Sequence, residues 1–401
     1  MHLPIYMDCH ATTPTDPRVF KAMAPYFTER FGNPSSRTHR FGWEAEKAVD
    51  RARHHVAALI GARAKEIVFT SGATESDNQA IKGVAEAYCD RGRHIITSVI
   101  EHRAVLASCR RLEKLGFKIT YLTVGKDGRV DPNDVRRSIT SETILISVMT
   151  ANSEIGVIQP IAEIGRIAKK EGILFHTDAV QAVGRVPFNV GALSVDLASI
   201  TAHKMYGPKG VGALYVRRKR PSIRLTPIID GGEQQDGLRS GTLNVPSIVG
   251  FGEAARLCLD EMSAEQKRVR SLRDHLLDGL QENISDLRVN GSMCYRLPNN
   301  LNVSFPGITG ESLVMGVSDV AMSTGSACAS GRDEPSHVLT ALGISRELAR
   351  ASIRLGLGRF NDIEQVNYAI QIISRAANRL RELSPVYESG SVGTNSLSGE
   401  G

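Results

Sequence analysis

The stretch that decides the fold is residues 66–76, which read EIVFTSGATES. Its first half, Glu66 to Thr70, is a short run of β-branched and apolar residues that is typical of a buried strand. Ser71 and Gly72 follow as a turn, and the residues from there to about Tyr88 are predicted to form a helix. A strand that passes through a glycine turn into a helix is the repeating unit of α/β proteins, and the flanking sequence repeats it.

Strands and helices alternate from about residue 56 to residue 216. Six further strands are predicted at residues 94–97, 118–122, 143–149, 173–177, 196–200 and 211–217, with helices at 103–115 and 161–170 between them. The most apolar of these strands are typical of a sheet whose two faces are both covered by helices. The pattern predicts an α/β fold with a large domain built on a mainly parallel seven-stranded sheet.

The rest of the chain predicts a smaller α+β domain. We expect a long charged helix at about residues 262–283, strands at 301–305 and 351–355, and a last helix near 362–383. The large domain is expected to span residues 14–258, and the small domain to combine residues 1–13 with 259–385. Residues 386–401 are rich in Ser and Gly with few apolar groups, so this tail is predicted to be disordered.

The composition is that of an ordinary soluble globular protein. Of the 401 residues, 41% are hydrophobic and 23% are charged. No apolar run approaches the roughly 20 residues that span a bilayer, and the N-terminus does not resemble a secretory signal. The six cysteines are scattered without a Cys-x-x-Cys pair, which indicates neither zinc nor disulfides and fits a reducing cytoplasm. The net charge of +6 is spread out, so we expect no membrane partner and no direct nucleic-acid binding.

One cysteine has unusual neighbours. Cys328 lies in residues 323–331, which read STGSACASG. A run of small residues without an apolar period predicts a surface loop that can move. Structural cysteines are usually buried, whereas a cysteine on such a loop is positioned to react. A chance cysteine in a linker is an equally good interpretation of this loop taken alone.

Polar residues follow several strands of the expected sheet, and the carboxyl ends of parallel strands are where ligands bind. Residues 72–74 open a helix whose free N–H groups suit a phosphate. Asp178 follows a strand, with Gln181 one helical turn later, and its carboxylate either holds a ring cation or caps the next helix. Lys204 also follows a strand, where it either loses its proton and attacks a carbonyl or points into solvent.

A phosphate site, an aspartate and a lysine at neighbouring strand ends are what pyridoxal 5′-phosphate requires. The lysine forms a Schiff base with the cofactor, and the aspartate keeps the pyridine nitrogen protonated so that the ring withdraws electrons. None of the three features indicates the cofactor by itself, but their coincidence favours it.

Nine short motifs resemble those of the cysteine desulfurases of the NifS/IscS type, which are fold-type-I pyridoxal-phosphate enzymes of aminotransferase class V. They are residues 11–14 (ATTP), 31–36 (FGNPSS), 70–76 (TSGATES), 101–102 (EH), 152–156 (NSEIG), 178–181 (DAVQ), 203–210 (HKMYGPKG), 239–242 (RSGT) and 326–328 (SAC). The resemblance covers about residues 3–385. It implies a homodimer that converts L-cysteine to L-alanine and passes the sulfur, as a persulfide, to an acceptor protein.

The resemblance also implies the residues of the site. Cys328 would accept the sulfur, Lys204 would bind the cofactor covalently, and His102 would contact the cofactor ring and move protons. Asn152 and Arg354 would bind the substrate carboxylate. No resident metal is expected, although Cys328 would transiently contact an iron–sulfur cluster on a partner. The other implied cofactor contacts are Ala73, Thr74, Asn152, Asp178, Gln181, Thr201, His203 and, from the neighbouring subunit, Thr242.

The chain departs from the family pattern in four places, one of which, Thr201 in place of a serine, keeps the hydroxyl. The family often has an aromatic residue or an asparagine in the segment that here reads Asp8-Cys9-His10, and often has asparagine in place of Ser153. The tail lacks the apolar ending that IscS-type enzymes use to grip a scaffold protein. An iron–sulfur scaffold, a tRNA-thiolation relay and a general persulfide acceptor therefore all stay open. A different class V reaction, such as that of an aminotransferase or a selenocysteine lyase, and a non-catalytic sulfur-trafficking protein are the competing interpretations.

Overall fold

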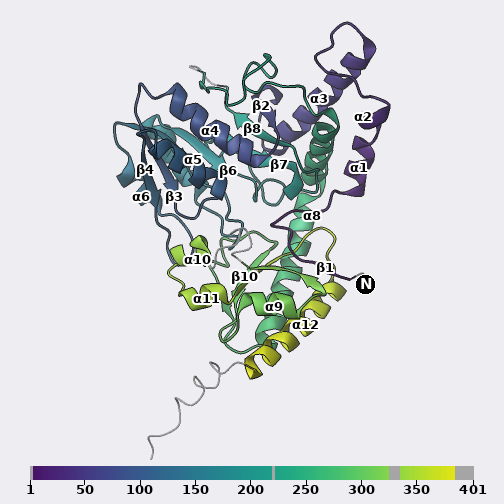
Figure 1. Cartoon of the computed structure of the whole chain (residues 1–401), viewed down its shortest axis with the longest axis vertical. Coiled ribbons are helices and arrows are strands. Elements are labelled where there is room, and N and C mark those ends of the chain that lie inside the picture. The colour runs from purple at the N-terminus through teal and green to yellow at the C-terminus, as the bar shows by residue number, and fades with distance from the viewer. Residues whose placement is uncertain (1–2, 219–221, 325–334, 384–401) are drawn as a thin grey trace, which may run out of the picture.

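The computed structural model describes residues 3–218, 222–324 and 335–383. The tail that we predicted to be disordered and the segment that contains Cys328 lie outside these ranges. Figure 1 shows a large sheet with its helices in the upper part of the molecule and a smaller sheet with its helices in the lower part. None of the described helices is long and apolar enough to cross a membrane.

Seven strands form the large sheet, in the order β2-β8-β7-β6-β5-β3-β4. They are β2 (Ile67–Thr70), β3 (His94–Ser98), β4 (Lys118–Leu122), β5 (Thr143–Ser147), β6 (Leu174–Asp178), β7 (Leu197–Thr201) and β8 (Gly212–Val216). Neighbouring strands are parallel except at β8, which runs antiparallel to both β2 and β7. The mainly parallel seven-stranded sheet expected from the sequence is confirmed, with one strand reversed.

Helices cover both faces of this sheet. Successive side chains of a strand point to opposite faces, and here both sets are apolar and must be buried. In β2, Ile67 and Phe69 join one apolar core, whereas Val68 joins the core on the other face. The first core also contains residues of α3 (Arg40–Leu59), α7 (Ile161–Glu171) and the short helices α1 (Pro17–Met23) and α6 (Pro132–Ser138). The second core contains residues of α4 (Ala73–Ala87) and α5 (Arg103–Glu113).

The lower part of the molecule holds two smaller sheets around a third core. An antiparallel sheet has the order β12-β13-β10-β9, and β1 pairs in parallel with β11. The N-terminal strand therefore lies beside the C-terminal third of the chain (Figure 1). The strands are β1 (Ile5–Tyr6), β9 (Arg288–Val289), β10 (Asn300–Ser304), β11 (Val320–Ala321), β12 (Ser323–Thr324) and β13 (Ser352–Gly356), and the helices are α9 (Gly310–Gly316), α10 (His337–Ala341), α11 (Arg346–Arg350) and α12 (Ile363–Glu382).

One long helix, α8 (Val245–Asn283), contributes buried residues to both parts. The sequence led us to expect its start near residue 262, and that prediction was wrong. Gly250 and Gly252 lower the helix propensity of the first turns. A Cβ at Gly252 would lie 2.4 Å from the Cα of Ala52, so the glycine lets α8 pack directly on α3. The division of the chain near residue 258 stays a prediction, since α8 passes through it unbroken.

Candidate active site

A cavity of about 630 Å³ lies at the carboxyl ends of the parallel strands of the large sheet. Its wall is completed by residues 10–12 of the N-terminal segment and by β13 of the small sheet. The polar residues expected at separate strand ends therefore meet in one place, as sheet geometry requires. Of the site residues implied by the resemblance, the wall contains Ala73, Thr74, His102, Asp178, Gln181, Thr201, His203, Lys204 and Arg354.

The anion site of this cavity is the start of α4. Gly72 is the N-cap residue, with a φ of 155° that favours glycine, and no side chain caps the first turn. The first N–H groups of the helix therefore receive no side-chain acceptor. A Cβ at Gly212 on β8 would lie 2.8 Å from the Cα of Gly72, so this turn rests directly on the next strand. The turn is suited to a phosphate group.

The carboxylate of the site is Asp178, at the buried end of β6. One of its oxygens, Oδ1, accepts a hydrogen bond of 3.0 Å from the Val180 N–H. Burial raises the pKa of Asp178, whereas the charges of His102 and Lys204 and the Val180 N–H lower it. Ligand atoms of Asp77, His102 and Asp178 all lie within 4.8 Å of one another.

Asp77 on α4 is a second buried carboxyl in this group. Burial, and then the charge of Asp178, raise the pKa of Asp77 well above its usual range. Of the two acids, Asp77 therefore keeps its proton more strongly, and the charge of Lys204 favours the ionised form of Asp178. His176 lies 3.7 Å from Asp77, and burial lowers the pKa of its ring to about 3, so His176 is neutral. Asp178 is thus the charged member of the group, as an interaction with a pyridinium nitrogen requires.

His102 is both a helix cap and part of the cavity wall. Its Nδ1 accepts a hydrogen bond of 3.2 Å from the Ala104 N–H at the start of α5. Because that nitrogen uses its lone pair, Nε2 carries the hydrogen in the neutral ring. The capping role that was the alternative from the sequence is therefore present, and it orients the ring. His102 offers a proton donor at Nε2.

Lys204 lies in the single-turn helix η2 (Ala202–Lys204) that follows β7. Its Nζ donates to the carbonyl oxygens of His10 and, at 2.6 Å, Ala11. The backbone carbonyl of Lys204 accepts a hydrogen bond of 2.9 Å from Arg185. The lysine is therefore held at both ends, and it does not point into bulk solvent as the alternative from the sequence would have it.

A cluster that we call the Tyr206 clamp, consisting of Arg185, Tyr206, Glu265 and Arg359, supports Lys204. Tyr206 has a φ of 64°, and its ring centre lies 4.6 Å from the guanidinium of Arg185 and 4.4 Å from that of Arg359. Glu265 on α8 accepts hydrogen bonds of 3.0 Å from Arg185, 3.1 Å from the Tyr206 hydroxyl and 2.8 Å from Arg359. Such fully partnered buried charges rigidify a structure. The sequence analysis missed all four residues, although Tyr206 stands within the motif of residues 203–210.

Arg354 on β13 is buried, and it enters the cavity from the small sheet. Its guanidinium pairs with Asp8 at 2.6 Å and donates at 3.1 Å to the carbonyl oxygen of Ser153. Its Nε has no hydrogen-bond partner among the described residues. Each terminal nitrogen carries a second N–H, so the residue keeps donors for a carboxylate, but Asp8 occupies part of its fork.

Two of the implied site residues that the structure describes do not line this cavity. Asn152 is buried beneath it, donating to the carbonyl of Ile100 at 2.9 Å and accepting from the N–H groups of Glu154 and Ile155. Thr242 is exposed near the start of α8 and does not line the cavity of its own chain. Cys328 lies outside the described residues.

The chain on either side of the Cys328 segment is nevertheless placed beside the cavity. In β12, Ser323 is the register partner of Arg354. On the far side of the segment, Ser336 donates a hydrogen bond of 2.5 Å to Glu154, and His337 lies 3.2 Å from the carbonyl oxygen of Glu101. The chain thus leaves and returns beside residues of the active site.

Glu101 gives the fold a dependence on pH. Its Oε1 accepts hydrogen bonds of 2.7 Å from Ser98 and 2.9 Å from the Met149 N–H, whereas Oε2 has no partner in the described chain. Burial raises the pKa of Glu101 from its usual 4.5 to about 8. The carboxyl therefore keeps its proton in the folded protein over a range in which the unfolded chain has lost it. Stability consequently falls as the pH rises from 4.5 to 8.

We expect Glu101→Gln to relieve this loss, because glutamine keeps the accepting oxygen and does not titrate. The gain in free energy of unfolding relative to wild type should be greater at pH 8 than at pH 5, by up to about 4 kcal/mol. Urea unfolding of both proteins at the two pH values measures it. A gain that is the same at both pH values would contradict the assignment.

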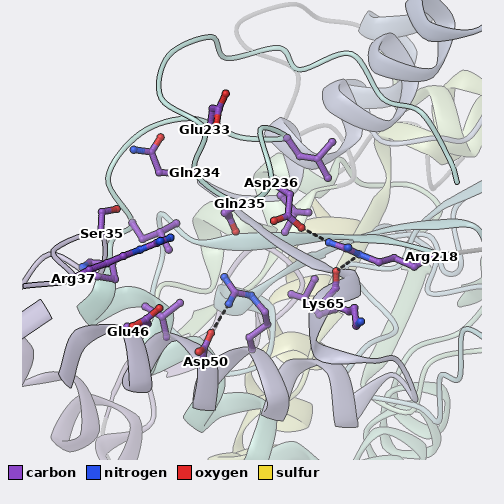
Figure 2. A pocket seen from close by; sticks show the side chains of 17 residues that line it. Ser35, Arg37, Glu46, Asp50, Lys65, Arg218, Glu233, Gln234, Gln235 and Asp236 are labelled. Atoms are coloured by element: carbon purple, nitrogen blue, oxygen red, sulfur yellow. Dashed lines mark hydrogen bonds and ion pairs between the residues drawn. The ribbon is translucent and has the colours of Figure 1, made fainter. Parts of the chain in front are cut away.

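A second cavity, of about 510 Å³, lies away from this site, and Figure 2 shows it. Four of the eight charged residues in its described lining are paired with one another. Arg218 bonds to Asp236, and Arg53 bonds to Asp50 at 2.7 Å. Its described lining includes none of the site residues implied by the resemblance. The chemistry therefore belongs to the first cavity.

The residues of the first cavity fit pyridoxal phosphate. An uncapped helix start suits its phosphate, a buried charged carboxylate suits its pyridine nitrogen, and a lysine held against the wall suits its aldehyde. The fold and this site together define a pyridoxal-phosphate-dependent enzyme of fold type I.

Comparison with known proteins agrees with this class and narrows it. The family model "Aminotransferase class-V" matches residues 5–368. The cysteine desulfurase IscS of Anaeromyxobacter dehalogenans is 58% identical over 388 residues, which are 97% of this chain and 96% of that protein. A solved NifS-like protein superposes with a TM-score of 0.88 at 40% identity, over 94% of this chain and all of the other.

A third relative was solved with a ligand. The structure titled "SspA in complex with cysteine" is 38% identical to this chain, covers 89% of it and all of the other chain, and has a TM-score of 0.79. The chain belongs to the class V aminotransferase family. Within that family it is a pyridoxal-phosphate-dependent enzyme of the cysteine desulfurase group.

Proposed function

We propose that this enzyme converts L-cysteine to L-alanine and transfers the sulfur to Cys328 as a persulfide. The observation that carries the proposal is the composition of one cavity. It joins an anion site, the charged Asp178 and Lys204 to Arg354, and the chain that leads to Cys328 departs beside Arg354. The cysteine named with the related SspA structure supports an amino-acid substrate of this kind.

Six residues would hold the cofactor besides Lys204. The N–H groups of Ala73 and Thr74, with Thr201 and His203, suit the phosphate, and Asp178 and Gln181 suit the ring. Burial lowers the pKa of His203 to about 4, so this ring acts as a neutral donor. Once bound, pyridoxal phosphate supplies an electron-withdrawing ring that weakens bonds at the carbons next to the substrate nitrogen.

The remaining residues bind the substrate and move its protons. Arg354 binds the carboxylate, and the Nζ of Lys204 takes the proton from Cα. His102 contacts the ring and supplies a proton from Nε2. Asn152 holds the turn of residues 152–156 through its side chain, which places Ser153 in the wall. We propose that Asn152 contributes to cofactor and substrate binding through this turn.

Sulfur transfer requires a nucleophile that accepts sulfur. The thiolate of Cys328 attacks the substrate sulfur, and a sulfur–sulfur bond forms while the substrate Cβ–S bond breaks. Cβ takes up a proton and leaves as the methyl group of alanine. Placing this cysteine on a segment that begins and ends beside the cavity lets the persulfide pass from the substrate to an outside acceptor.

The acceptor of the sulfur would be an iron–sulfur scaffold protein or a tRNA-thiolation relay. Cys328 would contact an iron–sulfur cluster only transiently, when that cluster is bound to a partner protein. We further propose a homodimer that acts in the cytoplasm. The names of the IscS relatives support an acceptor protein, and the six scattered cysteines favour a reducing compartment.

The proposed function is tested by supplying L-cysteine to the pure enzyme with a thiol reductant. Alanine and sulfide should appear in equal amounts. Alanine without sulfide, or keto-acid products, would favour a different class V reaction. A protein that binds cofactor and yet leaves cysteine unchanged would favour a non-catalytic sulfur-trafficking role.

The homodimer proposal makes a prediction about Thr242, which is exposed and does not line the cavity of its own chain. If its hydroxyl reaches the phosphate of the partner subunit, Thr242→Ala should weaken cofactor binding about tenfold, because a hydrogen bond to a charged group is lost. Thr242→Ser should restore it. Cofactor release during dialysis, followed by absorbance, measures the effect, and sedimentation should show a dimer throughout. A fully active monomer would contradict the proposal.

A further inference from the structure

Thr12 is a cavity residue to which the resemblance assigns no role. It belongs to the motif of residues 11–14, and it lies half-buried in the wall of the active-site cavity. The Tyr6 hydroxyl donates a hydrogen bond of 2.9 Å to its backbone carbonyl. The hydroxyl oxygen of Thr12 lies 3.1 Å from the Nδ1 of His203. Thr12 is therefore placed to act on the His203 ring.

The backbone keeps these two residues together. The Thr13 N–H and the Thr13 hydroxyl donate to the His203 carbonyl at 2.9 Å and 3.0 Å. The same hydroxyl accepts a hydrogen bond of 2.8 Å from the Tyr206 N–H. The motif that contains Thr12 is thus bonded along the motif that contains His203, and the contact between their side chains is set by the fold.

His203 lies beside the anion site of the cavity. It follows β7 directly, and Thr201 at the end of β7 is the register partner of Gly212, on which the turn at Gly72 rests. The Nε2 of His203 has no hydrogen-bond partner among the described residues, and it is not one of their buried unpartnered atoms. Since His203 lines the cavity, this nitrogen is accessible to a ligand there.

The charge state of the ring limits which arrangement of hydrogens suits a phosphate. Burial, and then the charges of Lys204 and Lys209, lower the pKa of His203 to about 4, so at neutral pH the ring is neutral and carries one hydrogen. Ionised phosphate oxygens only accept hydrogen bonds, so the ring binds them only when Nε2 carries that hydrogen. Nδ1 then carries the lone pair and needs a donor.

The Thr12 hydroxyl is suited to be that donor. Among the described residues, its single hydrogen has one other acceptor, the Thr13 carbonyl at 3.5 Å, which is at the limit of a hydrogen bond. We propose that Thr12 donates to the Nδ1 of His203 and thereby fixes the tautomer whose Nε2–H faces the cofactor phosphate. Thr12 is thus a positioning residue, and this inference rests on the proposed function in one respect, namely that His203 contacts the phosphate.

The test compares the cofactor with and without its phosphate. Thr12→Val removes the hydroxyl and keeps the shape of the side chain, whereas Thr12→Ser keeps the hydroxyl. The full-length enzyme is loaded with pyridoxal phosphate or with pyridoxal, and loss of visible absorbance during dialysis gives the release rate. Thr12→Val should release pyridoxal phosphate about tenfold faster and pyridoxal less than about twofold faster, because a hydrogen bond to a charged group is weakened. Thr12→Ser should behave as wild type with both.

A double-mutant cycle separates this role from a direct contact between Thr12 and the phosphate. The amide nitrogen of a glutamine at position 203 can take the place of Nε2, and it donates without help from Thr12. In the His203→Gln background, Thr12→Val should therefore change the release of pyridoxal phosphate by less than about twofold. Thermal unfolding shows whether each variant is folded, and Thr12→Ala carries the test if Thr12→Val is not.

Nuclear magnetic resonance of the loaded enzyme with ¹⁵N-labelled histidine gives a second measurement. The His203 ring should carry its hydrogen on Nε2 in the wild type and lose this preference in Thr12→Val. The signal is identified by its absence from His203→Gln. A structural role alone would not change the tautomer.

Three outcomes would overturn the inference. Equally faster release of both cofactors from Thr12→Val would mean that Thr12 only shapes the cavity. An effect that persists in the His203→Gln background would mean that Thr12 contacts the phosphate itself. A hydrogen on Nδ1 in the loaded wild type would mean that Thr12 accepts from the ring.

His203→Leu distinguishes a failure of this inference from a failure of the proposed function. If His203→Leu releases pyridoxal phosphate faster and Thr12→Val does not, the phosphate contact of His203 stands and the role of Thr12 is refuted. If His203→Leu releases it at the wild-type rate, the proposed phosphate contact is itself refuted.

Discussion

Lys204→Ala should abolish turnover of L-cysteine and remove the visible absorbance of the covalently bound cofactor. The loss of activity should be at least about a thousandfold, because the same amine binds the cofactor and takes the Cα proton. The structure supports this assignment through the placement of Lys204. Its side chain reaches the carbonyls of His10 and Ala11 across the cavity, and its own carbonyl is held by Arg185.

Lys209 provides the matched comparison, since it also lines the cavity but is exposed. Lys209→Ala should keep the visible absorbance, because the covalent bond does not depend on it. Spectra of the two purified variants, recorded after adding the cofactor, distinguish the lysines. Retention of the absorbance and of sulfide release in Lys204→Ala would refute the cofactor assignment.

Cys328→Ser should bind the cofactor normally but release almost no sulfide from L-cysteine. The rate should fall by about three orders of magnitude or more, as is found when a nucleophile is removed. A serine hydroxyl is hardly ionised at neutral pH and does not accept sulfur as a thiolate does. After turnover of the wild type, mass spectrometry should find the added sulfur on the peptide that contains Cys328.

The other cysteines serve as internal controls. Burial raises the pKa of the thiols of Cys9, Cys109 and Cys258 to about 11, 12 and 11, so these groups are not thiolates at neutral pH. Cys294 is exposed, and Cys294→Ser should release sulfide at the wild-type rate. Sulfur found mainly on a cysteine other than Cys328, or unimpaired release by Cys328→Ser, would defeat the assignment.

Much of the large sheet could be predicted from the sequence, because its strands are short apolar runs separated by turn residues. Strand β4, for example, has the predicted bounds of residues 118–122. The reversed direction of β8 could not be predicted. When helices cover both faces of a sheet, a strand has the same apolar sequence pattern whether it runs parallel or antiparallel to its neighbours. The first half of α8 was missed because it contains glycines, which disfavour helices. These glycines allow α8 to pack closely on α3, and the local sequence does not reveal that contact.

The site was predictable where a motif carries the chemistry. Lys204, Asp178 and the turn at residues 72–74 meet because parallel strand ends meet. The contacts made by individual side chains were not predictable. Asn152 is held by backbone groups of its own turn and of Ile100.

His10 was recognisable only as a departure from the family pattern. The orientation of its ring depends on Gln181, which is 171 positions away. A contact between residues so far apart leaves no signal in the residues around either of them.

The Tyr206 clamp restricts how access to the active site can change. Its members come from the large sheet side, from α8 and from the segment after β13, and pulling them apart would leave buried charges without partners at a cost of about 3–5 kcal/mol. We therefore expect any relative motion of the two parts to keep this cluster intact and to turn about it as a pivot. Atoms far from a pivot move furthest when the two parts turn about it. Lys204 is close to this pivot, because its backbone carbonyl is bonded to Arg185 of the cluster. The cavity can widen at its rim while the reactive amine stays still.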